Sequence, residues 1–145
     1  MTILSFCDPK TAMVTTKATV AEAIHVMLAC QVGAVAIVDE KNCVAGIFTE
    51  RDVMTKFALS GLDPADTLTR DLMTTPVHTA SNEITPSEAL TLMMERNFRH
   101  LPIVDSRGTL LGILSLRGLL QHRTEELTHE LDSLEAYFSN DSIGG

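Results

Sequence analysis

The chain has 145 residues and 45% hydrophobic residues, which is typical of a soluble globular domain and leaves no room for a large two-domain enzyme. Its 19 acidic and 11 basic residues give a net charge of −8, so the surface would repel a phosphate backbone and, more weakly, an anionic membrane. No apolar run approaches the ~20 residues of a membrane span. We therefore expect neither a nucleic acid nor a membrane as a partner.

The N-terminal sequence and the cysteines favour a cytoplasmic location. Residues 1–10 include Asp8 and Pro9 and show no basic region followed by an apolar stretch, so no secretory signal peptide is visible. The three cysteines are odd in number and far apart, which indicates reduced thiols rather than a disulfide framework. Cysteines and histidines form no ligand motif, so we expect no metal site.

The first half of the chain predicts an extended lead-in, a helix, two short strands and a second helix. Thr19 followed by Glu22 has the spacing of a capping box, in which the hydroxyl accepts from a free amide and the carboxylate reaches back to the cap. Apolar runs joined by an Asp turn form the strands, and the second helix begins after Thr49. The expected segments are 13–15 for the lead-in, 20–30 for the helix, and 34–38 and 44–48 for the strands.

A linker is predicted at residues 60–69, and the same order of elements then returns. Thr85 followed by Glu88 predicts another capping box, and Pro86 takes the first helical position, where its missing N–H costs nothing. The second set comprises a lead-in at 77–80, a helix at 86–97, strands at 101–104 and 110–114, and a helix that begins after Ser115.

The two halves are copies of one unit. A shift of 66 positions places residues 19–54 over residues 85–120 without a gap, and ten of the 36 pairs are identical. Several methionines favour adaptable packing, and we expect them to line the contact between the units. They are Met27, Met54, Met93 and Met94.

The residues after Leu120 belong to neither copy and predict a helix with one apolar face. That face carries Leu120, Thr124, Leu127, Leu131, Leu134 and Phe138. Two heptads are too few for an independent coiled coil, so the helix either packs back on the core or serves as a dimer arm or docking surface. Residues 140–145 are expected to fray.

These features together resemble a tandem pair of CBS domains, also called a Bateman module. The resemblance rests on the paired units, on LPIVD at residues 101–105 and above all on GIFTERD at residues 46–52, and it covers residues 14–120. It implies an α/β (α+β) fold in which two pseudo-twofold-related β-α-β-β-α units pack through their sheets, here followed by a C-terminal helix. The expected division is 1–66 for unit 1 with the linker, 67–123 for unit 2, and 124–145 for the helical extension and tail.

The resemblance also implies clefts that bind adenosine-containing ligands, namely AMP, ADP, ATP or S-adenosylmethionine. Family members regulate an attached or partner protein and perform no chemistry of their own. We therefore expect no catalytic residue, no required cofactor and no enzymatic activity. The absence of nucleophile-elbow and P-loop motifs agrees with this.

Thr49 and Asp52, within GIFTERD, are the first candidate ligand-binding residues. One carboxylate can accept both hydroxyl hydrogens of a ribose, and a hydroxyl at a helix start suits a phosphate. The spacing alone also fits a capping box without a ligand, whereas the resemblance favours binding. The second copy reads GILSLRG at residues 112–118, so Ser115 keeps the hydroxyl and Gly118 lacks the carboxylate. We therefore expect one nucleotide per chain, with Asp52 holding the ribose.

Basic side chains complete the candidate ligand-binding set. The resemblance places Arg99 and His100, which precede a strand of the second copy, opposite phosphates, and a solvated strand edge is the alternative interpretation. Arg51 either reaches a phosphate or pairs with a neighbouring carboxylate on the helix surface, which would stabilise the fold little.

Two functions fit these observations. The first is a module that senses an adenosine-containing nucleotide and modulates an unknown partner protein in trans. The alternative is a ligand-free dimeric interaction scaffold, in which Thr49 and Asp52 are helix caps. In either case we expect a homodimer, because apolar residues on the outer helices, such as Met54 and Leu119, would otherwise face water.

Overall fold

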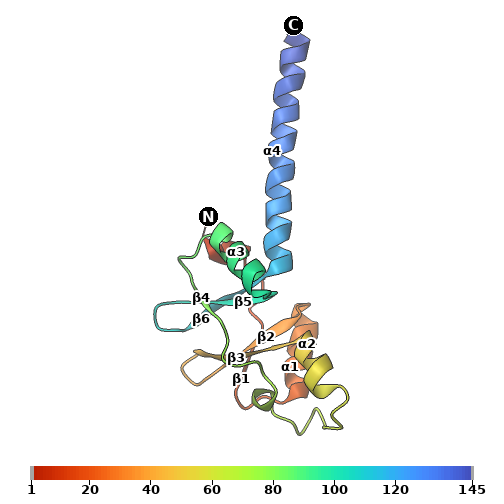
Figure 1. Ribbon diagram of the computed structural model, residues 1–145, viewed down its shortest axis with the longest axis vertical. Coiled ribbons are helices and arrows are strands. Elements are labelled where there is room, and N and C mark those ends of the chain that lie inside the picture. Colours follow the sequence, from red (N-terminus) through yellow and green to blue (C-terminus); the bar gives the residue numbers. More distant parts are fainter. Residues whose placement is uncertain (1, 145) are drawn as a thin grey trace.

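The computed structural model describes residues 2–144, and side chains as far as residue 136. It contains two three-stranded sheets with the same topology (Figure 1). In each sheet the first strand runs parallel to the second, and the third is antiparallel to the second. The first sheet contains β1 (Met13–Thr15), β2 (Ala34–Val38) and β3 (Val44–Thr49); the second contains β4 (Ala80–Ser81), β5 (His100–Val104) and β6 (Leu110–Ser115). The predicted pair of β-α-β-β-α units is confirmed.

The first helix of each unit begins where its Thr cap predicts. In α1 (Val20–Cys30) the Thr19 hydroxyl oxygen accepts from the Glu22 N–H at 3.2 Å, and in α3 (Pro86–Arg96) Thr85 accepts from the Glu88 N–H at 3.1 Å. Neither Glu carboxylate returns a bond to the cap N–H within the described residues, since Glu88 instead accepts from the Thr85 hydroxyl at 2.8 Å. These two positions are therefore simple caps and not the predicted capping boxes.

The second helices of the two units differ in length. In unit 1, α2 (Glu50–Asp52) continues into the π-helical turn η2 (Val53–Phe57), whereas in unit 2, α4 (Leu116–Gly144) runs on as one long helix. Two 3₁₀ turns, η1 (Ile3–Phe6) and η3 (Thr69–Asp71), lie in the segments before the first strand of each unit, residues 3–12 before β1 and 69–79 before β4, which are called the crossing lead-ins below.

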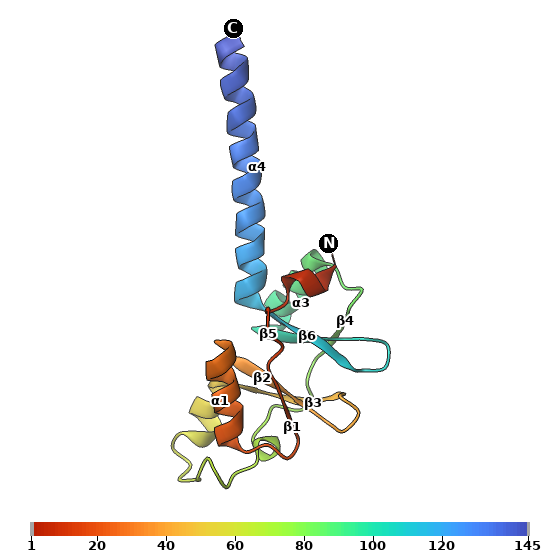
Figure 2. The same cartoon turned by 180° about the vertical axis from the view of Figure 1, so that it is seen from behind.

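Each lead-in crosses to the other unit before its own sheet begins. Ile3 and Phe6 of η1 are buried in the core of unit 2, and the N-terminal turn lies beside α3 in both views (Figure 2). In return, Thr74 exchanges backbone hydrogen bonds with Ile47 of unit 1 at 2.8 and 3.2 Å. Crossing requires a close approach at one glycine in each third strand, since a Cβ at Gly46 would overlap Met73 and a Cβ at Gly112 would lie 3.2 Å from the Cys7 sulfur.

The two sheets meet face to face through small and branched residues. Ala36, Val38, Leu110 and Ile113 form a buried cluster shared by the units, and the Leu110 N–H donates to the Asn42 carbonyl at 3.0 Å. The expectation that methionines line this contact was wrong. Met27 and Met93 lie in the separate cores, and Met54 and Met94 are 67% and 63% exposed, because the helices cover the outer faces of the sheets.

Helix α4 leaves the body of the protein and extends away from it (Figures 1 and 2). Leu127, Leu131 and Leu134 are more than half exposed, so this part of the helix does not pack back on the core. The alternative of a dimer arm or docking surface remains. The side chain of Phe138 lies outside the described part, and the fraying of residues 140–145 stays a prediction. The described helices include none long and apolar enough to cross a bilayer.

Candidate functional site

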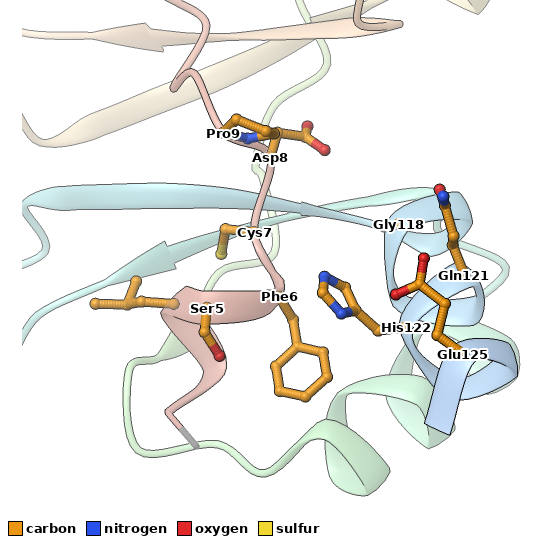
Figure 3. A pocket seen from close by; sticks show the side chains of 10 residues that line it. Ser5, Phe6, Cys7, Asp8, Pro9, Gly118, Gln121, His122 and Glu125 are labelled. Atoms are coloured by element: carbon orange, nitrogen blue, oxygen red, sulfur yellow. The ribbon is translucent and has the colours of Figure 1, made fainter. Parts of the chain in front are cut away.

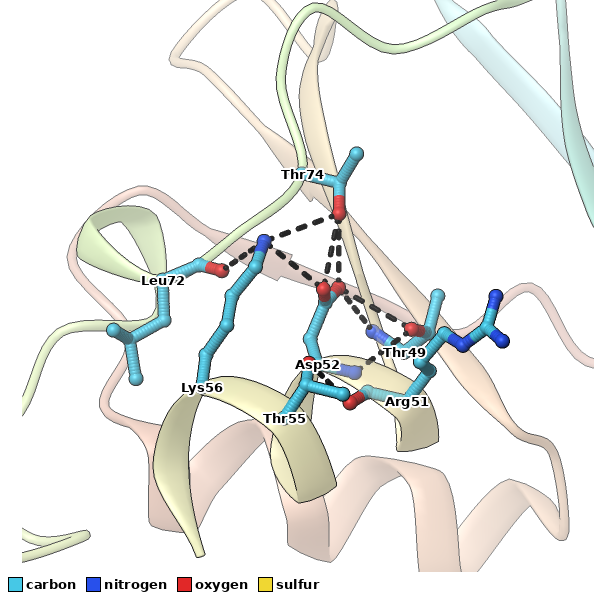
Figure 4. Close-up of polar contacts among 7 residues, drawn as sticks. All are labelled: Thr49, Arg51, Asp52, Thr55, Lys56, Leu72 and Thr74. Carbon is cyan, nitrogen blue, oxygen red and sulfur yellow. Dashed lines mark hydrogen bonds and ion pairs between the residues drawn. The ribbon is translucent and has the colours of Figure 1, made fainter. Parts of the chain in front are cut away.

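The first candidate corner joins β3 to α2. Thr49 ends the strand and caps the helix: its hydroxyl oxygen accepts from the Asp52 N–H at 3.2 Å, and Asp52 Oδ2 accepts from the Thr49 N–H at 3.1 Å (Figure 4). Both halves of a capping box are thus present at Thr49. The caps at Thr19 and Thr85 have only one of the two bonds in the part of the chain that the structure describes. The local geometry matches the capping interpretation that the spacing left open.

Asp52 is also held from the neighbouring elements. Its carboxylate is buried, with the residue 4% exposed, and it accepts from the Thr74 hydroxyl at 3.0 Å on the crossing lead-in. The Lys56 ammonium lies 3.0 Å from Asp52 Oδ1 and also donates to the Leu72 carbonyl at 3.1 Å (Figure 4). Both carboxylate oxygens are therefore occupied, and a ribose would have to displace Thr74 or Lys56. Ribose binding by Asp52 stays a prediction.

The second candidate corner joins β6 to α4. Ser115 accepts from the Gly118 N–H at 3.0 Å, as a helix cap does, and its hydroxyl lies 3.2 Å from Asp8 Oδ1. His100 stands opposite Ser115 in the pairing of β5 with β6. The structure thus brings Asp8, His100 and Ser115 together, although Asp8 belongs to the N-terminal segment.

Burial and nearby charges set the ionisation of this group. Burial is the main cause that lowers the pKa of His100; the carboxylates of Asp8 and Glu50 raise it and Arg99 lowers it further. Burial raises the pKa of Asp8, while the Ser115 hydrogen bond and His100 lower it. His100 is accordingly neutral at pH 7, where it can donate one hydrogen bond.

The six predicted ligand-binding residues fall into two groups rather than one. Thr49, Arg51 and Asp52 surround the first corner; Arg99, His100 and Ser115 surround the second. Arg51 and Arg99 are exposed, and neither forms an ion pair within the described residues. The surface pairing considered for Arg51 is therefore not formed, because Asp52 pairs with Lys56.

A cavity of about 550 Å³ lies at the second corner, between the N-terminal segment and the first turns of α4 (Figure 3). Phe6, Cys7 and Asp8 line one side of it, and Gly118 and His122 the other. Burial, with a smaller contribution from Asp8, raises the pKa of the Cys7 thiol to about 11, so this wall stays an uncharged thiol.

Asp8 is the site residue that sequence reasoning missed. Extending the 66-residue shift beyond the matched segment places Asp8 over Thr74, and each of these residues reaches one corner: Thr74 donates to Asp52 at the first, and Asp8 accepts from Ser115 at the second. Asp8 and Thr74 are different residue types, so a comparison of the two copies for identical residues does not detect this pair.

A family model for the CBS domain matches residues 5–59 and 69–125. The chain belongs to the CBS-domain family. It is 41% identical over 90 residues to the uncharacterized protein MK0525 of Methanopyrus kandleri, a match that covers 62% of this chain and 46% of that protein. This CBS pair therefore spans about half the length of that relative.

Solved structures agree with the family match. A protein with CBS domains from Burkholderia ambifaria has a TM-score of 0.72 and 30% identity, over 84% of this chain and 93% of its own. CBSX2 in complex with AMP has a TM-score of 0.72 at 22% identity, over 86% of this chain and 96% of its own. The resemblance to a tandem CBS pair is confirmed.

Proposed function

We propose that this CBS pair is a regulatory module that binds an adenosine-containing nucleotide and modulates a partner protein in trans. The observation that carries the proposal is the pair of equivalent corners, each with a hydroxyl that caps a helix and a carboxylate beside it. CBSX2, whose fold this chain shares, was crystallised with AMP. AMP, ADP, ATP and S-adenosylmethionine are the candidate ligands, and no further cofactor is required.

Within this proposal the six candidate residues divide the work of binding. In the assignment that the intact motif favours, Asp52 accepts the ribose hydroxyls at the first corner once Thr74 or Lys56 has turned away. Hydroxyls and basic groups face the phosphates. These are Thr49, Ser115, Arg51, Arg99 and His100.

We assign the chain no catalytic activity of its own and place it in the cytoplasm. The described residues hold no group of three His, Cys, Asp or Glu side chains that could bind a metal ion, and the three cysteines are free. A binding module needs a shaped and partly polar site but no activated nucleophile, which is consistent with what surrounds the two corners.

We also propose that the working unit is a homodimer. Met54 on the outer face of unit 1 is 67% exposed and Leu120 on α4 is 44% exposed, and a twofold contact would bury such residues against their own copies. Leu119, which the sequence placed in the same interface, is instead buried in the core of unit 2, so it does not contribute.

A thermal-shift titration with AMP, ADP, ATP, S-adenosylmethionine and NADH tests the ligand. A ligand at 100 times its Kd adds about 2.7 kcal/mol to the free energy of unfolding, which raises Tm by several degrees for a chain of this size. We expect at least one adenosine-containing compound to do so. No shift with any compound would favour the ligand-free scaffold.

The Asp52→Asn variant then tests the proposed ribose contact. If Asp52 holds the ribose, loss of this charged acceptor weakens binding by roughly 1.5–3 kcal/mol. Because Asp52 also stabilises the fold, the ligand-induced shift is compared with each variant's own Tm. Glu40→Gln, an exposed residue in the β2–β3 turn, serves as the control for the loss of one negative charge. An unchanged affinity in Asp52→Asn would remove Asp52 from the site.

A further inference from the structure

The two corners are built from equivalent positions, but their carboxylates come from different elements. At the first corner the carboxylate is Asp52 of α2 and the lead-in supplies the hydroxyl of Thr74. At the second corner the positions 66 residues away are Gly118 on the helix and Asp8 on the lead-in. The carboxylate has thus moved from the helix to the crossing segment.

This exchange leaves the second corner open. Asp52 has the ammonium of Lys56, the hydroxyls of Thr49 and Thr74 and the Thr49 N–H as donors. Asp8 has the Ser115 hydroxyl as its one side-chain donor within the described residues. His122 occupies the position equivalent to Lys56, and its ring packs edge-on against Phe6 at 4.8 Å between centroids. In the described part of the chain, His122 therefore contacts an aromatic ring and forms no ion pair with Asp8, which is among the residues that line the cavity (Figure 3).

We propose that the second corner is the open nucleoside site of this chain, and that Asp8 replaces the carboxylate missing at Gly118 and accepts the ribose hydroxyls. The inference rests on the proposed nucleotide-binding function and changes where its ribose is held. The sequence pattern favoured Asp52, because the intact motif lies there. The contacts favour Asp8, since its carboxylate keeps free acceptor capacity and faces a cavity.

The lining of the cavity indicates which part of a nucleotide it takes. Asp8 and Glu125 supply negative charge, and no Lys or Arg lines the cavity, so it disfavours phosphates. Phe6 and Pro9 offer apolar surface for a base. The phosphates would instead extend toward His100 and the exposed Arg99, beside Ser115.

Calorimetric titration with AMP and 2′-deoxy-AMP tests this assignment on the full chain. A carboxylate that accepts two ribose hydroxyls favours AMP over the 2′-deoxy compound. We expect the wild-type protein to show this preference, and Asp8→Asn to weaken AMP binding roughly ten- to hundredfold and to abolish the preference. Asp52→Asn should keep the preference.

Two further variants separate the binding role from a structural one. A Cβ at Gly118 would lie 3.8 Å from Asp8 Oδ1, so Gly118→Asp places two carboxylates together and should weaken binding of AMP. Combining Asp8→Thr with Gly118→Asp moves the carboxylate back to the helix but without the Lys56 ammonium of the first corner, because His122 stands at that position and packs against Phe6. This double variant should restore both the affinity and the preference. Circular dichroism confirms that each variant is folded.

The outcomes distinguish the inference from the function on which it rests. If the wild-type protein binds AMP and Asp52→Asn loses the preference while Asp8→Asn keeps it, the inference is wrong and the proposed function stands. Failure of the double variant to bind AMP, when Gly118→Asp alone binds it as wild type does, also overturns the inference. No binding of either nucleotide by the wild-type protein overturns the proposed function itself.

Discussion

At the scale of single residues, the position of His100 links the second corner to the rest of the molecule. The imidazole is partly buried beside Ser115, within electrostatic reach of Asp8, Glu50 and Arg99. Glu50 begins α2 of unit 1, so charges from both units act on a side chain of unit 2. Burial is the largest of these effects and favours the neutral form.

The lowered pKa of His100 predicts a specific dependence of stability on pH. Below its ordinary pKa of 6.5 the unfolded chain takes up a proton that the folded chain does not, so the folded state loses stability as the pH falls. The raised pKa of Asp8 acts in the opposite sense, because stability from that group is lost as the pH rises above 3.8. We expect His100→Gln to reduce the loss of stability between pH 7 and pH 5.

Urea unfolding of the wild type and His100→Gln at several pH values measures this effect. The difference in free energy of unfolding should move in favour of the variant as the pH decreases from 7 to 5, while the m-values stay equal. A difference that is constant with pH would show that His100 does not titrate differently in the folded state.

At the scale of elements, the crossing lead-ins connect the two units. In unit 2, Ile3 and Phe6 are buried in the core and the Asp8 N–H donates to the Ile113 carbonyl of β6. In unit 1, Met73 packs against the core and Thr74 exchanges backbone hydrogen bonds with β3. The core of each unit therefore includes residues from a segment that lies outside its own helices and strands. This exchange also carries Asp8 and Thr74 to the two corners.

Truncating Phe6 should destabilise unit 2 although the residue precedes the first strand of unit 1. Phe6 is 4% exposed in the core of unit 2, and Phe→Ala in a core costs about 3–5 kcal/mol. Leu4→Ala, in the same turn but 38% exposed, should cost about 1 kcal/mol or less. Hydrogen exchange in Phe6→Ala should increase first in β5 and β6. An increase that begins in β2 and β3 would contradict the crossing.

At the scale of the whole molecule, the described part of α4 presents apolar side chains to solvent. Its leucines repeat with heptad spacing and are exposed, and the same helix carries five acidic residues between positions 125 and 135. Apolar burial favours pairing of two such helices, whereas their like charges oppose it and are screened by salt.

Light scattering on the full chain and on a truncation that ends after Arg123 tests the proposed dimer. We expect the full chain at micromolar concentration to show twice the 15.8 kDa of one chain, more completely at high salt if α4 helices pair. A truncated chain that becomes monomeric would identify α4 as the dimer arm, and one that stays dimeric would place the contact on the outer faces of the units. A monomeric full chain would contradict the dimer.

The sequence by itself determined the elements and their repetition, because these depend on local chemistry. Strand β2 and helix α1 have the predicted bounds, since a continuous apolar run and a Thr cap act over a few residues. The 66-residue shift predicted that the second unit would copy the first, and in the structure the likeness extends to a bulge between Ile103 and Val104 that matches the one between Ile37 and Val38.

Only the tertiary structure shows that the Asp52 carboxylate is occupied and that Asp8 lines a cavity at the second corner. The bond between Ser115 and Asp8 joins residues 107 positions apart, and it exists because the lead-in of one unit packs on the other. Likewise, Lys56 and Thr74 occupy the Asp52 carboxylate through contacts that its motif does not encode. Motif spacing reports the residues that one element carries, whereas the accessibility of a carboxylate depends on what other elements place against it.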